Sequence, residues 1–210
     1  MTLPADAPRL RPFADVCATA IGVAFLVGWW TAGPVAEGGA LDLATVVGLI
    51  LVTGMMVLRL PSLAFGPEWH LPVITLLLAL RELDFDKRFM ETGVLKLRLY
   101  TGDAPLASKA VGACVIGLIL TCLYRLIRHN GPDFRLSLRA REGWAVAIGL
   151  GVLAGIVAKS IDGLGRKLAP FGIDLSDAQT IFAATAQETL EFGFAAALLL
   201  ALFLWIRRYA

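Results

Sequence analysis

The sequence has little charge and few of the residues that build metal or redox sites. Only 17% of its residues are Asp, Glu, Lys or Arg, where a soluble domain has about a quarter. Its three cysteines show no C-x-x-C spacing, and it has only two histidines. This composition excludes a disulfide scaffold, a disordered chain and an ordinary cytosolic enzyme, and it predicts neither a metal site nor a cofactor.

An excess of positive charge is also missing. Nineteen Lys and Arg residues stand against 17 Asp and Glu residues, which leaves a formal charge of +2. No segment combines a basic run with interleaved aromatic residues, so we expect no nucleic-acid partner.

What the sequence has instead is long apolar runs. Hydrophobic residues make up 58% of the chain, and its mean hydropathy is +0.74. Runs of about 20 apolar residues match the thickness of a bilayer's hydrocarbon core. The first run ends at Trp29 and Trp30, which favour a membrane boundary over a signal-peptide cleavage site. We therefore predict an all-α, polytopic transmembrane helix bundle.

Six spans are predicted within one domain, residues 13–206, between an N-terminal tail (1–12) and a C-terminal tail (207–210). The spans cover residues 13–31, 41–60, 63–83, 105–128, 142–161 and 180–206, and 84–104 is expected to be an amphipathic connector. The third run contains Pro67 and Pro72, so a bent or re-entrant segment and a count of five spans form the alternative.

The distribution of basic residues decides the predicted orientation only narrowly. With six spans and the N-terminus inside, ten of the 19 Lys and Arg residues are cytoplasmic. If 63–83 does not cross, twelve of the 19 are inside. The loop at 32–40 contains acidic Glu37 but no Lys or Arg, which favours a non-cytoplasmic position for it.

Polar residues are predicted to gather at one membrane face. The fourth and fifth runs together cross the membrane twice, so the loops at 84–104 and 162–179 share a side. The candidate polar cluster on that side comprises Arg81, Glu82, Asp84, Lys87, Lys96, Arg98, Lys109, Lys159, Glu188 and Glu191.

Glu188 and Glu191 form the strongest pair in this cluster. A spacing of three residues puts both carboxylates on one helix face. Counting back about 20 residues from Trp205 leaves both within the hydrocarbon region. Since an unpaired charge is costly there, each should meet a cation, with Lys159 or Arg81 as partner, or hold a proton. A structural ion pair and a proton-handling or substrate-binding role are both compatible with this pattern.

Two further segments carry polar residues of interest. Apolar and polar residues alternate from Val94 to Tyr100, which predicts an extended segment on the membrane surface. Lys96 and Arg98 there could hold a lipid phosphate or simply reach the interface. Glu68 and His70 form a second candidate site; a metal ion would need more ligands, so a proton-handling role or a helix start are the alternatives.

Small residues recur at every fourth position in the last two runs, where they allow helices to approach closely. The stripes are Ala147, Gly151 and Gly155 in one run and Gly193, Ala197 and Ala201 in the other. We expect them to join helices within one chain, with a homo-oligomer or a protein partner as the alternative.

The segments RELDFDKRF and GVLKLRLY, together with the later AQETLEFGFAAALLLAL, resemble uncharacterised bacterial multi-pass inner-membrane proteins. These proteins carry an R-E-[LM]-D-[WF]-x-K signature and an E-x-x-E entry to their last helix. The resemblance touches about 40 of the 210 residues. It implies a multi-pass inner-membrane protein without an assigned activity. The matching positions are Arg81, Glu82, Asp84, Lys87, Lys96, Glu188 and Glu191.

Three functions are consistent with these patterns. The first is a structural or accessory protein of the bacterial inner membrane, in contact with membrane lipids, and it ranks above the others. The second is a proton-linked transporter that uses the intramembrane carboxylates. The third is a membrane enzyme that acts on lipid headgroups with a carboxylate as general base; no nucleophile is recognisable, so this alternative ranks last.

Overall fold

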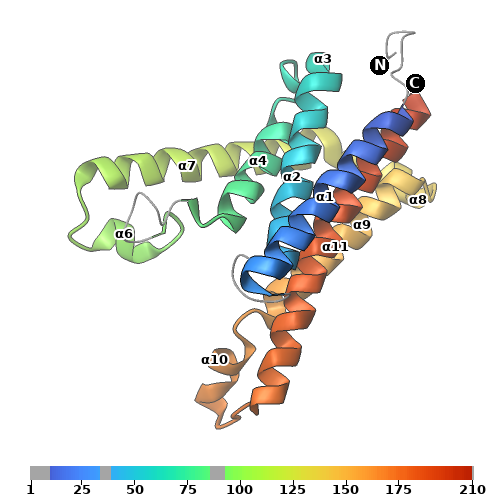
Figure 1. Ribbon diagram of the computed structural model, residues 1–210. Coiled ribbons are helices and arrows are strands. Elements are labelled where there is room, and N and C mark those ends of the chain that lie inside the picture. The colour runs from blue at the N-terminus through green and yellow to red at the C-terminus, as the bar shows by residue number, and fades with distance from the viewer. Residues whose placement is uncertain (1–9, 34–38, 86–92, 210) are drawn as a thin grey trace. The chain divides into compact units, whose positions relative to one another are not determined.

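The computed structural model describes residues 10–33, 39–85 and 93–209, and every regular element in these ranges is a helix (Figure 1). The helices are α1 (Leu10–Ala32), α2 (Ala40–Arg59), α3 (Pro61–Ala64), α4 (His70–Glu82), α6 (Leu97–Thr101), α7 (Leu106–Arg125), the π-helix η1 (Leu126–Asn130), α8 (Gly131–Arg139), α9 (Gly143–Ile161), α10 (Leu164–Leu168), the 3₁₀-helix η2 (Ala169–Phe171) and α11 (Asp177–Tyr209). The predicted all-α class is confirmed.

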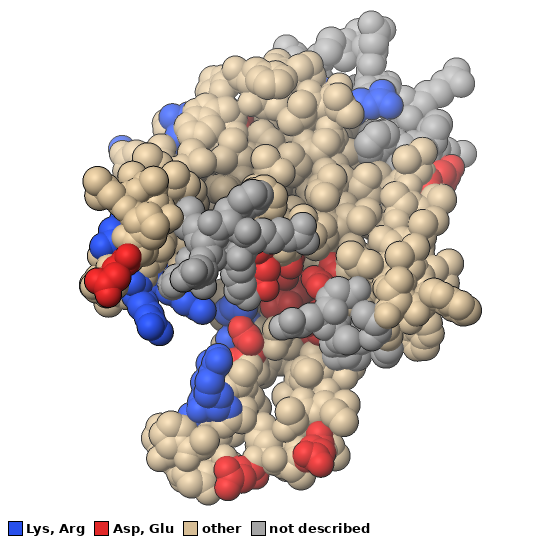
Figure 2. Space-filling model, turned by 60° about the vertical axis from the view of Figure 1, so that its left-hand side comes forward, with Lys and Arg blue, Asp and Glu red and all other residues tan. Residues whose placement is uncertain are grey.

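Five helices in the described ranges are long and apolar enough to cross a membrane. They are Ala14–Thr31, Ala40–Arg59, Leu106–Arg139, Gly143–Ile161 and Asp177–Arg208. Many large apolar side chains on them are exposed, such as Leu26 and Leu153. Figure 2 agrees, because uncharged residues make up most of the visible surface. A bilayer would cover such side chains, as the apolar runs predicted.

The predicted span at 63–83 is wrong as a single helix. Instead α3 and α4 are separated by a turn, and the 13 residues of α4 reach only about 20 Å, short of a hydrocarbon core of about 30 Å. Gly66 makes the turn possible, because a Cβ there would lie 2.2 Å from the Ser62 carbonyl oxygen. Pro72 lies in the first turn of α4, where proline is tolerated. The alternative count of five spans is the one that the helix lengths support.

The other predicted spans coincide with helices, with shifted ends. α11 begins at Asp177 and ends at Tyr209, beyond both predicted limits. It starts with a capping box. The main-chain N–H of Gln179 donates to Ser176 Oγ at 3.4 Å, and the main-chain N–H of Ser176 donates to the side-chain Oε1 of Gln179 at 2.9 Å. α7 continues through η1 into α8, so this helix ends at Arg139.

The chain divides into two compact units, residues 1–52 with 140–210, and residues 53–139. In the first unit, α9 and α11 are the main contact. They run antiparallel, so that Gly143 lies beside Leu204 at one end and Gly155 beside Phe194 towards the other. α2 adds to this pair, with Gly48 beside Ala195. We refer to α9, α10 and α11 together as the C-terminal hairpin.

The second unit contains α3, α4, α6, α7, η1 and α8. α6 packs on α7 at Gly112, where a Cβ would lie 2.5 Å from Tyr100 Oη and 2.9 Å from Leu99 Cδ2. Tyr100 Oη donates to the Val94 carbonyl at 2.8 Å, and Leu99 is buried. The extended segment predicted for 94–100 is therefore wrong from Leu97 onwards: packing of Leu99 against α7 selects a helical turn over the local alternation.

Candidate functional site

Lys159 lies at the polar end of the C-terminal hairpin and contacts two carboxylates. Its Nζ is 2.7 Å from Asp162 Oδ2 and 3.9 Å from Glu191 Oε1. Gln187 Nε2 also approaches Glu191 Oε1, at 3.4 Å. We call these four residues, Lys159, Asp162, Gln187 and Glu191, the hairpin cluster. The cluster joins the last turn of α9 to the middle part of α11, which contains Gln187 and Glu191.

Local backbone chemistry positions the hairpin cluster. Asp162 follows the last residue of α9, and Gly163 then adopts the left-handed conformation that commonly ends a helix, with φ +62°. Lys167 Nζ donates to the Lys159 and Ser160 carbonyls at 3.0 and 3.1 Å, which satisfies acceptors at the end of α9. The chain therefore turns sharply and keeps Lys159 near Asp162.

The two carboxylates have different environments. Asp162 is 38% exposed, whereas Glu191 is only 15% exposed. The hydrogen bond from Lys159 holds the pKa of Asp162 below its ordinary value. Because Lys159 is closer to Asp162, the more shielded Glu191 has the longer ion pair of the two.

The predicted ten-residue cluster spans both units of the chain. Lys159, Glu188 and Glu191 belong to the first unit, and the other members lie between residues 53 and 139. The sequence offered Lys159 or Arg81 as the cation for the glutamates, and the structure brings Lys159 and Glu191 together. Glu188 is half-buried and has contacts of its own. The pairing with Arg81, and the gathering of all ten residues, stay predictions.

The remaining members lie in the second unit. Lys109 Nζ donates to the Gly102 carbonyl at 2.8 Å, so it closes the end of α6. Four further members of the predicted cluster are exposed: Arg81, Asp84, Lys96 and Arg98. Glu82 is half-buried. Lys87 lies outside the described residues.

His70 forms a second site with more partners than the sequence indicated. Its side chain is fully buried. Its Nε2 is 2.7 Å from Asn130 Oδ1, and its Nδ1 accepts from Arg125 Nε at 3.3 Å. Asn130 Nδ2 donates in turn to Glu68 Oε2 at 2.8 Å. These contacts connect Arg125, His70, Asn130 and Glu68 in one network, in which Glu68 Oε2 also lies 3.5 Å from His70 Nε2.

Arg125 also holds the segment before α4. It donates to the Pro67 carbonyl oxygen, and its guanidinium carbon lies 5.6 Å from the Trp69 ring centroid. We call Glu68, Trp69, His70, Arg125 and Asn130 the His70 cluster.

The π-helix η1 explains why sequence reasoning missed Arg125 and Asn130. In an α-helix, side chains five residues apart point about 140° away from each other. A π-helix closes its hydrogen bonds between residues five apart, as the Gly131 amide does to the Leu126 carbonyl. Two side chains five apart therefore both reach His70. Two polar residues at the end of an apolar run were the only available signal.

No group of three or more His, Cys, Asp and Glu side chains in the described ranges is arranged to hold a metal ion. Within the same ranges, every buried side-chain nitrogen and oxygen atom has a hydrogen-bond partner.

The small-residue stripes approach each other within one chain at Gly151. A Cβ on Gly151 would lie 2.9 Å from Ala197 Cβ and 3.5 Å from the Phe194 carbonyl oxygen. Gly155 has ordinary contact with Phe194, and a Cβ on Gly193 would meet nothing within 4 Å in the described part of the chain. A protein partner or homo-oligomer through these residues stays a prediction.

Comparison of the chain with protein-family models, with curated proteins and with solved structures gave no match. The resemblance to bacterial inner-membrane proteins therefore rests on the quoted motifs.

Proposed function

We propose that this protein is a multi-pass protein of the bacterial inner membrane with a structural or accessory role. The observation that carries the proposal is the sharing of Lys159 between Asp162 and Glu191. Such a shared cation fixes the register of α9 against α11 and neutralises a shielded carboxylate. A charge near the hydrocarbon region is tolerated when it is paired in this way.

The opposite end of the hairpin supports the same role. Arg208 forms an ion pair with Glu142, which also accepts from Trp144 Nε1 at 2.8 Å. Trp144 and Trp205 are placed as interfacial anchors at this end. Ion pairs thus join both ends of α9 to α11.

Five crossings with a cytoplasmic N-terminus put twelve of the 19 Lys and Arg residues inside. This orientation places the connection between α9 and α11 in the cytoplasm and the segment before α9 outside. It is the orientation we propose.

Replacement of Glu191 tests the structural role. Glu191→Gln removes the charge and keeps the volume, so thermal stability in detergent should fall, by the same amount with or without added ions and metabolites. Asp174→Asn is the matched control, because Asp174 is an exposed loop carboxylate of the same unit. Equal stability of both variants would contradict the proposal.

A proton-linked transporter is the second candidate, and the 3.9 Å ion pair of the shielded Glu191 favours it. Ionisable side chains inside membrane spans often mark proton or ion pathways. Wild-type protein in proteoliposomes would then move protons, and Glu191→Gln would abolish the flux. Proton flux of this kind would favour transport over the structural role.

A further inference from the structure

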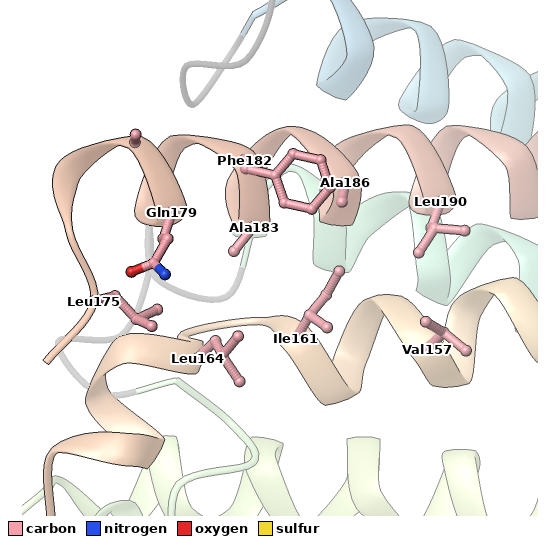
Figure 3. Close-up of a pocket in the computed structure, with 10 residues that line it drawn as sticks. Val157, Ile161, Leu164, Leu175, Gln179, Phe182, Ala183, Ala186 and Leu190 are labelled. Carbon is pink, nitrogen blue, oxygen red and sulfur yellow. The ribbon is translucent and has the colours of Figure 1, made fainter. Parts of the chain in front are cut away.

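An apolar groove lies on the C-terminal hairpin, beside the hairpin cluster. It has a volume of about 560 Å³, within the range of about 300–1,000 Å³ that is typical of ligand sites. Val157 and Ile161 of α9 and Ala186 and Leu190 of α11 face the space between the two helices, as Figure 3 shows. Gln179 is the one uncharged polar side chain among the residues that line it.

The groove runs from the hydrocarbon layer towards the headgroups. At 1.5 Å per residue, Leu190 lies about 22 Å along α11 from Trp205, and Gln179 lies about 39 Å from it. If Trp205 marks one edge of a hydrocarbon core of about 30 Å, the core contains Leu190, and Gln179 lies about 9 Å beyond the opposite edge, at the outer limit of the headgroup region. The groove is therefore apolar even where the surrounding bilayer is polar.

The end of the groove near α10 and Gln179 has hydrogen-bond donors and positively charged side chains. Gln179 Oε1 accepts from Ser176 N and Oγ, whereas no described residue accepts from Gln179 Nε2. Leu164 of α10 lines the groove, and Arg166 and Lys167 follow on the same helix. Both are exposed, and no described carboxylate forms an ion pair with Arg166. Lys167 donates to the Lys159 and Ser160 carbonyls, and both Arg166 and Lys167 also act electrostatically on Asp162.

We propose that the groove binds one acyl chain of an anionic glycerophospholipid. The chain lies between α9 and α11, an ester carbonyl accepts from Gln179 Nε2, and the phosphate lies near Arg166 and Lys167. Lipid tails are as apolar as the groove, so burial of the chain alone gives no selectivity. Selectivity comes from the amide and the guanidinium, which pairs well with phosphate oxygens. The inference rests on the proposed membrane location.

The test measures phospholipid that stays with the purified protein after extensive exchange into detergent. Ala183 lines the groove, whereas Ala184 is exposed and does not line it. Ala183→Trp should lose the retained phospholipid, and Ala184→Trp should keep it. Arg166→Gln should keep a lipid but lose the preference for phosphatidylglycerol and cardiolipin over phosphatidylethanolamine. Equal retention in the Ala183 and Ala184 variants would overturn the proposal.

A second measurement uses the wild-type chain, so it does not depend on how a variant folds. A phosphatidylglycerol with a photoreactive acyl chain, in vesicles with the protein, should label Phe182 and its groove neighbours. Labelling confined to outward residues such as Leu153 would refute the site. A dimer that Ala183→Trp dissociates would mean that a second copy fills the groove, which also refutes it. Recovery of the protein outside the membrane fraction would instead refute the membrane location.

Discussion

The close approach of α9 and α11 at Gly151 makes a prediction whose size can be worked from the structure. In Gly151→Ala, the new methyl group would lie 2.9 Å from Ala197 Cβ, where ordinary contact begins at 3.4 Å. Ala197 Cβ is bonded directly to the main chain and cannot rotate away, so the two helices must separate by about half an ångström. Overpacking of this kind costs about 1–3 kcal/mol.

Gly193→Ala is the matched control on α11. A methyl group at Gly193 meets nothing within 4 Å in the described residues. Both substitutions gain the same helix propensity, up to about 1 kcal/mol, so this gain cancels when the two variants are compared. The difference between them measures the cost at the helix contact alone, and we expect about 1–3 kcal/mol.

The assay is unfolding by titration with sodium dodecyl sulfate in mixed micelles, followed by circular dichroism and tryptophan fluorescence. Gly151→Ala should unfold at a lower mole fraction of the denaturing detergent than Gly193→Ala. If the two variants unfold together, or in the reverse order, α9 and α11 do not meet at Gly151 and the hairpin geometry is wrong.

Two further predictions concern the His70 cluster and the hairpin cluster. His70→Leu removes the partner of Asn130 Oδ1 and of Arg125 Nε and should lower the free energy of unfolding by about 1–3 kcal/mol. His129→Leu, at an exposed position, should change it little, and thermal unfolding of both variants checks this. The pKa of Asp162 is lowered in the folded state. Its ionised form therefore adds to the free energy of unfolding at any pH above its unfolded-state pKa of about 3.9, and this stabilisation is lost as the pH falls through its folded-state pKa. Near pH 7 the melting temperature of the wild type should exceed that of Asp162→Asn, by a modest amount because Asp162 is 38% exposed. A difference of the same size at acid pH would contradict the role given to this ion pair.

Much of the helical architecture could be predicted, because an apolar run long enough to cross a bilayer must satisfy its backbone hydrogen bonds internally, which a helix does. α2, α7, α9 and α11 begin within a few residues of their predicted starts. The continuous helix formed by α7, η1 and α8, and also α11, extend past their predicted ends, because polar segments such as 126–139 can remain helical in water.

The errors came where tertiary contacts decided the local structure. Residues 63–83 are apolar on average, but Pro67 and the tight turn at Gly66 divide the segment before a full span forms. Residues 97–101 alternate like a strand, yet packing of Leu99 on α7 makes them helical. Neither effect is visible in a window of local hydropathy.

The sites were predictable in part for the same reason. Counting back from Trp205 put Glu191 within the hydrocarbon region, and the sequence offered Lys159 or Arg81 as its partner. The His70 cluster depends on a π-helix that brings Arg125 and Asn130 to one side. Such a bulge changes which residues share a face, so ordinary helical periodicity does not bring these two residues together.

The central claim is that the C-terminal hairpin crosses the membrane, and cysteine accessibility tests it most directly. Single cysteines at Ala140 and at Asp174, both exposed, would be placed in a chain whose Cys17, Cys114 and Cys122 are replaced by alanine. Intact cells are labelled with a membrane-impermeant maleimide. The account predicts labelling of Ala140→Cys from outside and of Asp174→Cys only after the membrane is opened. Labelling of both positions from the same side would contradict it.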